Sequence, residues 1–161
     1  EYMVKEILLL GNKELYQKSQ MVQKGEDLTD LIQDLHDTLI DYRRKHHVGR
    51  AIAAPQIGVK KRVIYYNTDH AIVFINPVLT FPDNEKMEIL DDCMSFPNLL
   101  VKVKRYKRCV ITYMTPEWKE RRMELEGGLS ELLQHEYDHL DGILATMRAI
   151  DNQSLVYKKE L

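Results

Sequence analysis

The sequence predicts an α+β fold in which mostly antiparallel sheets surround one central helix. Three observations in chain order support this: an amphipathic helical pattern, a series of short strand patterns, and a second helical pattern. The chain has 161 residues, and no internal repeat, low-complexity tract or Pro/Gly/Ser-rich linker divides it. We therefore expect a single domain over residues 1–161.

The two ends of the chain are expected to contribute little to that domain. Glu1 and Tyr2 precede Met3, so we interpret them as an expression remnant or a trimmed start. Residues 151–161 are predominantly polar, and we predict that they form a mobile tail.

The first helical pattern covers residues 28 to about 46. Gly49 follows shortly afterwards, and a glycine at this point is a common stop signal for a helix. The apolar residues of the pattern recur at the three- and four-residue spacing of an amphipathic helix: Leu28, Leu31, Ile32, Leu35, Leu39 and Ile40.

Six short strand patterns, rich in β-branched and aromatic residues, follow this helix. A turn at Pro116-Glu117 joins the last two of them. Gly127 and Gly128 then end the strand series, and the segment Leu129–Leu140 returns to helical spacing. The six predicted strands cover residues 62–66, 71–75, 87–90, 99–103, 110–115 and 123–125.

Composition is that of a globular protein and indicates no nucleic-acid or membrane partner. Hydrophobic residues make up 44% and charged residues 30%, and the formal net charge is only −2. The basic run from Lys102 to Arg108 fits the solvated face of a strand. No apolar stretch reaches the roughly 18 residues that a membrane helix needs, and no signal peptide is recognised. We therefore expect a cytoplasmic chain.

Two cysteines, Cys93 and Cys109, are expected to stay reduced in that compartment. Cys109 is flanked by Val110 and Ile111, so we interpret it as a small buried hydrophobic residue. Cys93 lies at a polar-to-apolar junction just after a strand pattern, where its thiolate is available as a ligand.

The second helical pattern contains an HExxH motif, His135–His139. Four residues turn an α-helix by about 400°, so both imidazoles project from one face and can bind one metal ion. Glu136 lies about 100° around the helix from His135, within reach of a water on that ion. This combination of residues predicts metal-assisted hydrolysis with Glu136 handling the proton.

A catalytic site of this kind needs a third protein ligand. A histidine six residues after His139 is excluded, because that position is Ala145. Glu160 has the distance at which gluzincin-type peptidases place a glutamate, but it lies in the polar tail. Cys93, 42 residues before His135, is the other candidate.

Three separated motifs then point to one family. Gly49–Gln56 reads GRAIAAPQ against a family pattern of G-x-G-L-A-A-P-Q, and Asp91–Ser95 reads DDCMS against E-G-C-L-S. Gln134–Gly142 matches Q-H-E-x-D-H-L-x-G at every fixed position, and Ile75-Asn76-Pro77 matches a further I-N-P element. In these motifs and their order, the chain resembles the peptide deformylases from about residue 5 to residue 150.

This resemblance implies a metal centre and the residues around it. Cys93, His135 and His139 would be the metal ligands, and Glu136 would be the general acid and base. The side-chain amide of Gln56 and the backbone N–H of Met94 would form the oxyanion hole. The implied reaction is hydrolysis of the N-formyl group of N-formylmethionyl peptides during protein biosynthesis, with release of formate.

The resemblance also implies where the substrate lies. The segment formed by Gly49, Arg50, Ala51 and Ile52 would pair with the substrate backbone like an added strand. The methionine side chain would enter a pocket near these residues, whose expected lining is Arg50, Ala51, Ile89, Leu132 and His135.

Among the departures from the family pattern, three bear on the site. Asp91 replaces a glutamate that pairs with an arginine in the family, for which Arg105 is the candidate here. Asp92 replaces a glycine, which would strain the chain if the backbone there needs a positive φ. Ala51 replaces another glycine and adds a methyl group where the substrate approaches.

The ligand types suit zinc, iron(II), cobalt or nickel. By resemblance we expect one iron(II) ion per chain in the cell, and zinc or nickel in purified protein. The expected partners are N-formylmethionyl peptides, with transient proximity to the ribosome. Two alternatives stay open: a gluzincin-like peptidase that uses Glu160, and a deformylase-like protein that binds metal and peptide with little or no turnover.

Overall fold

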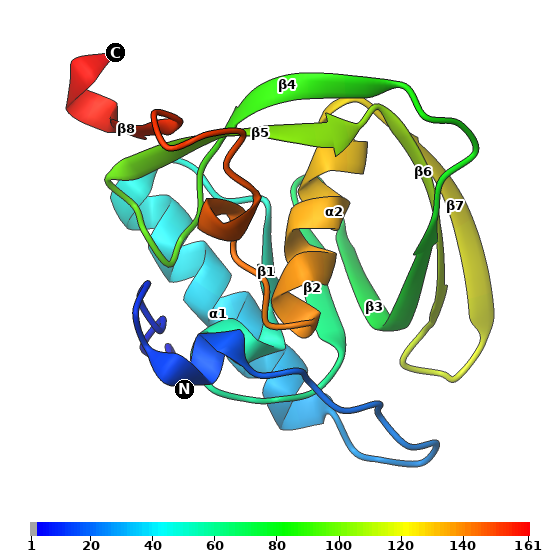
Figure 1. Cartoon of the computed structure of the whole chain (residues 1–161). Helices are drawn as coiled ribbons and strands as arrows, with labels where there is room; N and C mark the ends of the chain where they lie inside the picture. Colours follow the sequence, from blue (N-terminus) through cyan, green and yellow to red (C-terminus); the bar gives the residue numbers. More distant parts are fainter. Residues whose placement is uncertain (1–2) are drawn as a thin grey trace.

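The computed structural model describes residues 3–161, so the interpretation of Glu1 and Tyr2 falls outside the described residues. A five-stranded sheet has the order β1-β2-β3-β6-β7, and a three-stranded sheet has the order β4-β5-β8 (Figure 1). Every strand pairing in them is antiparallel. With two α-helices added, this confirms the predicted α+β class. The first sheet contains β1 (Ala51–Ala53), β2 (Val63–Asn67), β3 (Ala71–Thr80), β6 (Arg108–Met114) and β7 (Glu120–Glu126). The second contains β4 (Lys86–Asp91), β5 (Leu99–Tyr106) and β8 (Leu155–Tyr157).

Helix α1 (Thr29–His46) matches the first predicted helix. Its buried positions Leu35, Leu39 and Tyr42 pack on β1 and β2 in one core cluster. The helix ends because His47 adopts a left-handed conformation, with a φ of 61°, and donates its N–H to the carbonyl of Arg43. The stop therefore lies two residues before the predicted Gly49.

The predicted strands are all present, and β3, β4, β5 and β7 contain the whole of their expected ranges and extend beyond them. Strand β3 continues through Pro77 to Thr80, although proline cannot donate to a sheet ladder. The register with β6 shifts between Ile75 and Val78, and Asn76 has a φ of 49°. At this β-bulge the pairing is interrupted around Pro77 and resumes at Val78, so the strand can continue beyond the proline.

Two short strands were not predicted. Strand β1 has only three residues, which is too short for a periodic pattern. Strand β8, Leu155–Tyr157, lies in the segment predicted to be a mobile polar tail, but its backbone pairs with β5 and Ser154 before it is buried. The tail prediction is therefore wrong for these residues.

The basic run on β5 is only partly solvated. Lys102 and Lys104 are exposed, as the strand interpretation predicts. Arg105 lies on the opposite face and is only 3% exposed, because successive side chains of a strand point to opposite sides. Inside, it meets the carboxylates of Asp91 and Asp138.

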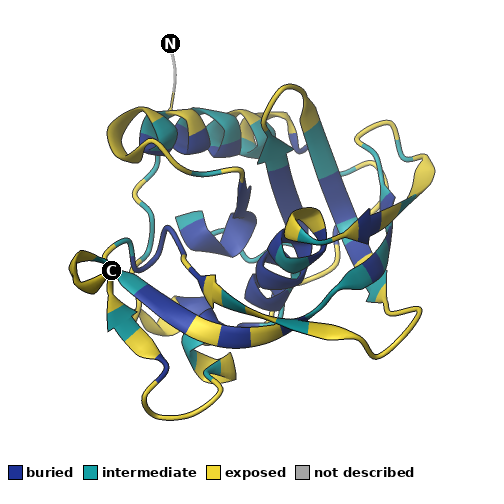
Figure 2. Cartoon of the chain, turned by 90° about the horizontal axis from the view of Figure 1, so that it is seen from above, coloured by how far each residue is buried: buried dark blue, intermediate teal, exposed yellow. Residues whose placement is uncertain are grey.

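Helix α2 (Gly128–Leu140) runs through the middle of the molecule and contacts strands of both sheets (Figure 1). Leu132, Leu133 and Leu140 pack against the inner face of the five-stranded sheet, in the core cluster that also holds Cys109. Buried residues gather on the inward sides of the elements, and exposed residues lie outside (Figure 2). No described helix has the length and apolar character to cross a bilayer.

Candidate metal centre

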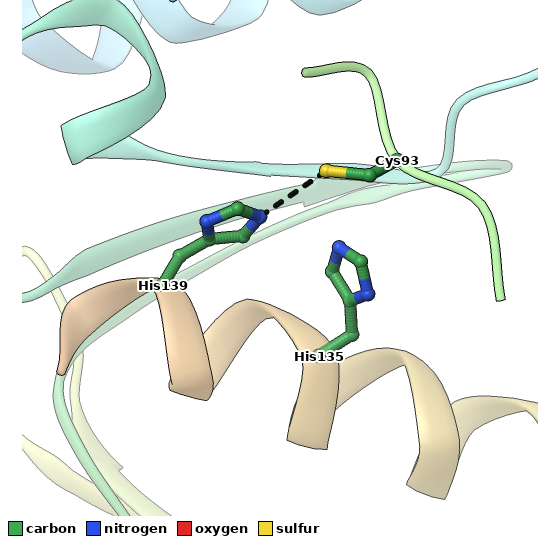
Figure 3. A group of neighbouring side chains, drawn as sticks. All are labelled: Cys93, His135 and His139. Atoms are coloured by element: carbon green, nitrogen blue, oxygen red, sulfur yellow. Dashed lines mark hydrogen bonds between the residues drawn. The ribbon is translucent and has the colours of Figure 1, made fainter. Parts of the chain in front are cut away.

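Helix α2 presents His135 and His139 to the same buried space. The four-residue spacing places the two rings one turn apart, with centroids 5.0 Å from each other. Their exposed fractions are only 5% and 1%. Figure 3 shows both rings rising from one side of the helix.

Cys93 meets these rings from the loop that follows β4 (Figure 3). Its Sγ atom lies 3.3 Å from Nε2 of His139, and the three ligand atoms of Cys93, His135 and His139 all lie within 4.8 Å of one another. Tetrahedral zinc with ordinary bond lengths would separate its sulfur and nitrogen ligands by about 3.6 Å. The cluster therefore has dimensions that fit one transition-metal ion.

A carboxylate behind His135 sets the orientation of its ring. Oδ2 of Asp91 lies 2.9 Å from Nδ1 of His135, which leaves Nε2 of this ring for the buried space. The same carboxylate oxygen accepts a hydrogen bond from Nη2 of Arg105 at 2.9 Å. The expected pairing of Asp91 with Arg105 is thus present despite the shorter side chain.

The ion-pair network extends from Arg105 to the surface. Its Nη1 donates to Oδ2 of Asp138 at 2.7 Å. Arg148, which is 45% exposed at its side chain, donates to both oxygens of Asp138. Arg105 and Asp91 therefore hold each other in place inside the protein, and Asp138 and Arg148 complete the charge balance.

The two histidines have opposite pKa shifts. Burial disfavours the charged form of His135, but the Asp91 carboxylate and the Cys93 sulfur together raise its pKa well above the usual value. Burial and the nearby charge of His135 lower the pKa of His139 well below the usual value. The ring of His135, which is paired with Asp91, thus attracts a proton or a cation. The ring of His139 stays neutral and is available as a ligand.

Glu136 is buried beside this cluster with one oxygen unused. Its Oε1 atom has no hydrogen-bond partner among the described residues, and burial raises the pKa of the carboxyl group to about 7. A buried carboxylate without a partner is costly, which indicates that it has a partner in the working protein. An ionisation near neutrality also suits a group that accepts and returns a proton.

Gln56 reaches the cluster from the short helical turn Ala54–Ile57. Its Oε1 accepts the backbone N–H of Ala53 at 2.9 Å, which fixes which end of the amide faces inward. Its Nε2 lies 3.6 Å from Sγ of Cys93 and 3.2 Å from Oγ of Ser95. A neutral N–H donor is thus held next to the candidate ligand.

The family model for polypeptide deformylase matches residues 4–154 of this chain. This range includes both sheets except the last strand, both helices and every residue of the cluster. The chain belongs to the polypeptide deformylase family. It is accordingly a metal-dependent hydrolase, and its activity is removal of the N-formyl group from nascent peptides.

Curated relatives agree over nearly the whole length. Peptide deformylase 1 of Prochlorococcus marinus is 36% identical over 172 residues, which cover 98% of this chain and 87% of that protein. The peptide deformylase of Dictyoglomus turgidum is 32% identical over 159 residues, which cover 98% of this chain and all of that protein.

Solved deformylase structures share the fold. A peptide deformylase from Legionella pneumophila superposes with a TM-score of 0.84 at 29% identity, over 94% of this chain and 88% of that one. The peptide deformylase of Thermotoga maritima gives 0.83 at 29% identity, over 94% of this chain and all of that one.

A cavity of about 340 Å³ opens onto the metal cluster. Its lining includes most of the site residues expected from the sequence: Gly49, Arg50, Ala51, Gln56, Cys93, Met94, Leu132, His135 and Glu136. Tyr42, Val48, Leu90 and Glu131 also line it, and sequence reasoning missed them. Glu131 had a signal, because it lies one helical turn before His135 on the same face of α2.

The side chains of Ile52 and Ile89 do not line the cavity. That of Ile52 is fully buried in the core cluster under α1, because neighbouring residues of β1 point to opposite faces. The expected contact of Ile52 with the substrate is through its backbone and stays a prediction. Ile89 packs with Val101 and Val103 beneath the three-stranded sheet. Its neighbour Leu90 points the other way and lines the cavity instead.

The structure also bears on the expectations for Asp92, the two cysteines and Glu160. The φ of Asp92 is not positive, so its backbone is not strained as it would be in a left-handed conformation. Asp92 lines the cavity, and its Oδ2 atom lies 3.9 Å from Nζ of Lys158. Cys93 and Cys109 are both free thiols. Glu160 is exposed in a C-terminal turn, outside the candidate ligand cluster of the described residues. The gluzincin alternative therefore gains no support.

Proposed function

We propose that the chain hydrolyses the formyl amide of N-formylmethionyl peptides at a centre formed by Cys93, His135 and His139. One observation carries the proposal: a thiol and two imidazoles lie within bonding range of a single ion, beside a buried carboxylate oxygen without a partner. This arrangement matches three protein ligands, one open position and a base.

The donor set supports a divalent transition metal as the resident ion. One sulfur and two nitrogen donors suit iron(II), zinc, cobalt and nickel, and disfavour magnesium and calcium. We take iron(II) as the ion in the cell and expect zinc or nickel in purified protein. When bound, the ion supplies a Lewis acid and lowers the pKa of a water in its open position.

Glu136 is the proposed general base and acid. Glu136 lines the cavity and its Oε1 atom has no partner among the described residues, so it is proposed to take the proton of the attacking water and pass it to the leaving nitrogen. A carboxyl group with a pKa of about 7 can do both near neutral pH.

Gln56 and Met94 are proposed to stabilise the negative charge that develops on the formyl oxygen. Nε2 of Gln56 is held in place because the carbonyl end of the same amide is bound by Ala53. The backbone N–H of Met94 comes directly after the ligand Cys93. Fixed neutral donors of this kind stabilise the transition state without reorganisation.

Strand β1 is the proposed docking edge for the substrate backbone. It pairs with β2 on one side only, and its other side borders the cavity with Gly49, Arg50 and Ala51. An extended peptide can add to that edge as a further strand. Since formylated N-termini arise during protein synthesis, the proposed place of action is the cytoplasm, in transient proximity to the ribosome.

The test is formate release from formyl-Met-Ala-Ser by protein loaded anaerobically with iron(II). Release above the rate of the Glu136→Gln variant supports the proposal, because that variant should keep its metal and lose about 10²- to 10⁴-fold in kcat. Bound metal and bound peptide without formate would instead establish the alternative of a protein without turnover.

A further inference from the structure

An ion pair forms part of the cavity wall beside the metal ligands. Nη2 of Arg50 lies 3.1 Å from Oε1 of Glu131. Arg50 comes from the segment leading into β1 and Glu131 from α2, so the pair spans two walls of one cavity. Polar side chains here need an explanation, because pockets for an apolar substrate group are lined mostly by hydrophobic residues.

Glu131 lies close to the reacting centre. It is four residues before His135, so the two Cβ atoms are about 5–6 Å apart on the same helix face. Its side chain is only 17% exposed. In a substrate whose formyl carbon lies at the metal ligands, the first side chain begins three bonds away, so this side chain is the substrate group best placed to reach Glu131.

The neighbouring backbone leaves room for the guanidinium group. A Cβ atom added at Gly128, one helical turn before Leu132, would lie 3.5 Å from Nη1 of Arg50. That distance is an ordinary van der Waals contact, so the guanidinium group lies against the start of α2. The side chain of Arg50 is 45% exposed, so its remaining donors stay open to the cavity and to solvent.

We propose that Arg50 and Glu131 determine specificity for the first residue of the formylated peptide. Together they let the site accept, besides methionine, a side chain that ends in both a hydrogen-bond donor and an acceptor, such as that of glutamine. The inference rests on the proposed function. Glutamine and methionine have similar length, and a purely apolar pocket rejects the amide because its polar atoms lose their partners. Here Arg50 can donate to the amide oxygen and Glu131 can accept from the amide nitrogen.

The experiment compares kcat/KM for three formyl tripeptides that differ only in the first residue: methionine, its apolar isostere norleucine, and glutamine. We expect the norleucine-to-glutamine ratio of the unaltered protein to stay within about tenfold, where an apolar pocket would give on the order of 100-fold. The double variant Arg50→Leu/Glu131→Leu should raise the ratio by about tenfold or more. Each ratio is taken within one variant, so a change in overall rate cancels.

The control is Arg122→Leu/Glu124→Leu, which removes a more exposed Arg–Glu pair on β7, at the edge of the five-stranded sheet opposite β1. Its ratio should equal that of the unaltered protein. If the Leu double variant unfolds, Glu131→Met supplies a replacement of similar length that removes the acceptor, and it should still raise the ratio. An unchanged ratio in a folded, metal-loaded Arg50/Glu131 variant would overturn the inference.

Failure of the proposed function would look different. In that case no peptide yields formate, and the inference is tested by direct calorimetric binding of the deformylated tripeptides. Glutamine and norleucine peptides should then bind within about tenfold of each other, and the Arg50/Glu131 variant should lose the glutamine peptide selectively. Equal loss of both peptides would overturn the role of the pair in selectivity.

Discussion

Oδ2 of Asp91 lies 2.9 Å from Nδ1 of His135, and both side chains are about 5% exposed. The same oxygen is held by Arg105, so the ring, the carboxylate and the guanidinium form one buried chain. A ligand whose second ring nitrogen is bound in this way has a fixed tautomer and direction. The network therefore orients the candidate metal centre from behind.

The Asp91→Asn variant is expected to weaken metal binding by about 10- to 100-fold. Its amide keeps the size of the side chain but loses the charge that orients and polarises His135. Competition with a chromogenic chelator measures the change. Asp91→Glu is the matched control and should retain the affinity within a few-fold, because it restores a longer carboxylate; equal affinity for Asp91→Asn would contradict a positioning role.

The two cysteines should behave differently when each is replaced by alanine. Cys93→Ala removes the sulfur ligand and should abolish stoichiometric metal in purified protein. Cys109→Ala should keep one metal ion per chain, because its thiol lies in the core cluster between α2 and the five-stranded sheet. Elemental analysis of both proteins is the measurement, and full metal content in Cys93→Ala would reject the ligand assignment.

Removal of Arg105 should destabilise the fold severely. Arg105→Ala leaves Asp91 without its cation and removes one of the two arginines of Asp138. Unpaired buried charge of this kind costs about 3–5 kcal/mol in the free energy of unfolding. Denaturant unfolding of the metal-loaded protein tests this, with Lys104→Ala as control. Lys104 is the exposed neighbour on β5, and its loss should cost less than about 0.5 kcal/mol.

Metal uptake should strengthen as the pH rises. The pKa of His135 lies well above its usual value in the metal-free protein, so the ring is protonated at neutral pH and must release that proton to bind metal. Each proton released changes the apparent affinity by about tenfold per pH unit. Metal titrations at pH 6, 7 and 8 check the slope, and an affinity independent of pH would contradict the protonated state of His135.

The fold could be predicted wherever side-chain periodicity is strong. The pattern from Leu28 to Ile40 repeats over three helical turns, and α1 begins at Thr29 and ends at His46. Short elements were missed for a physical reason. Strands β1 and β8 have three residues each, and their existence depends on the pairing partners β2 and β5 rather than on a pattern of their own.

Arg105 shows the same limit for the residue pattern alone, since only the family resemblance predicted its pairing with Asp91. Within the basic run of the sequence it looks like its exposed neighbours Lys102 and Lys104. The pleat of β5 turns it inward, and the carboxylates of Asp91 and Asp138 make its burial possible. Likewise, Ile89 was expected to line the methionine pocket, but the alternation of β4 packs it with Val101 and Val103 and places Leu90 at the cavity.

The sequence by itself determined that His135 and His139 share one helix face, because helical geometry relates residues four apart whatever the rest of the chain does. It also placed Glu136 next to them. Only the tertiary structure decided whether Cys93 or Glu160 is the third candidate ligand. Cys93 lies 42 residues before His135 and Glu160 lies in the C-terminal turn, so helical geometry relates neither of them to the two rings. The packing of β4 and its following loop over α2 brings the Cys93 sulfur within 3.3 Å of His139 and leaves Glu160 exposed at the C-terminal end.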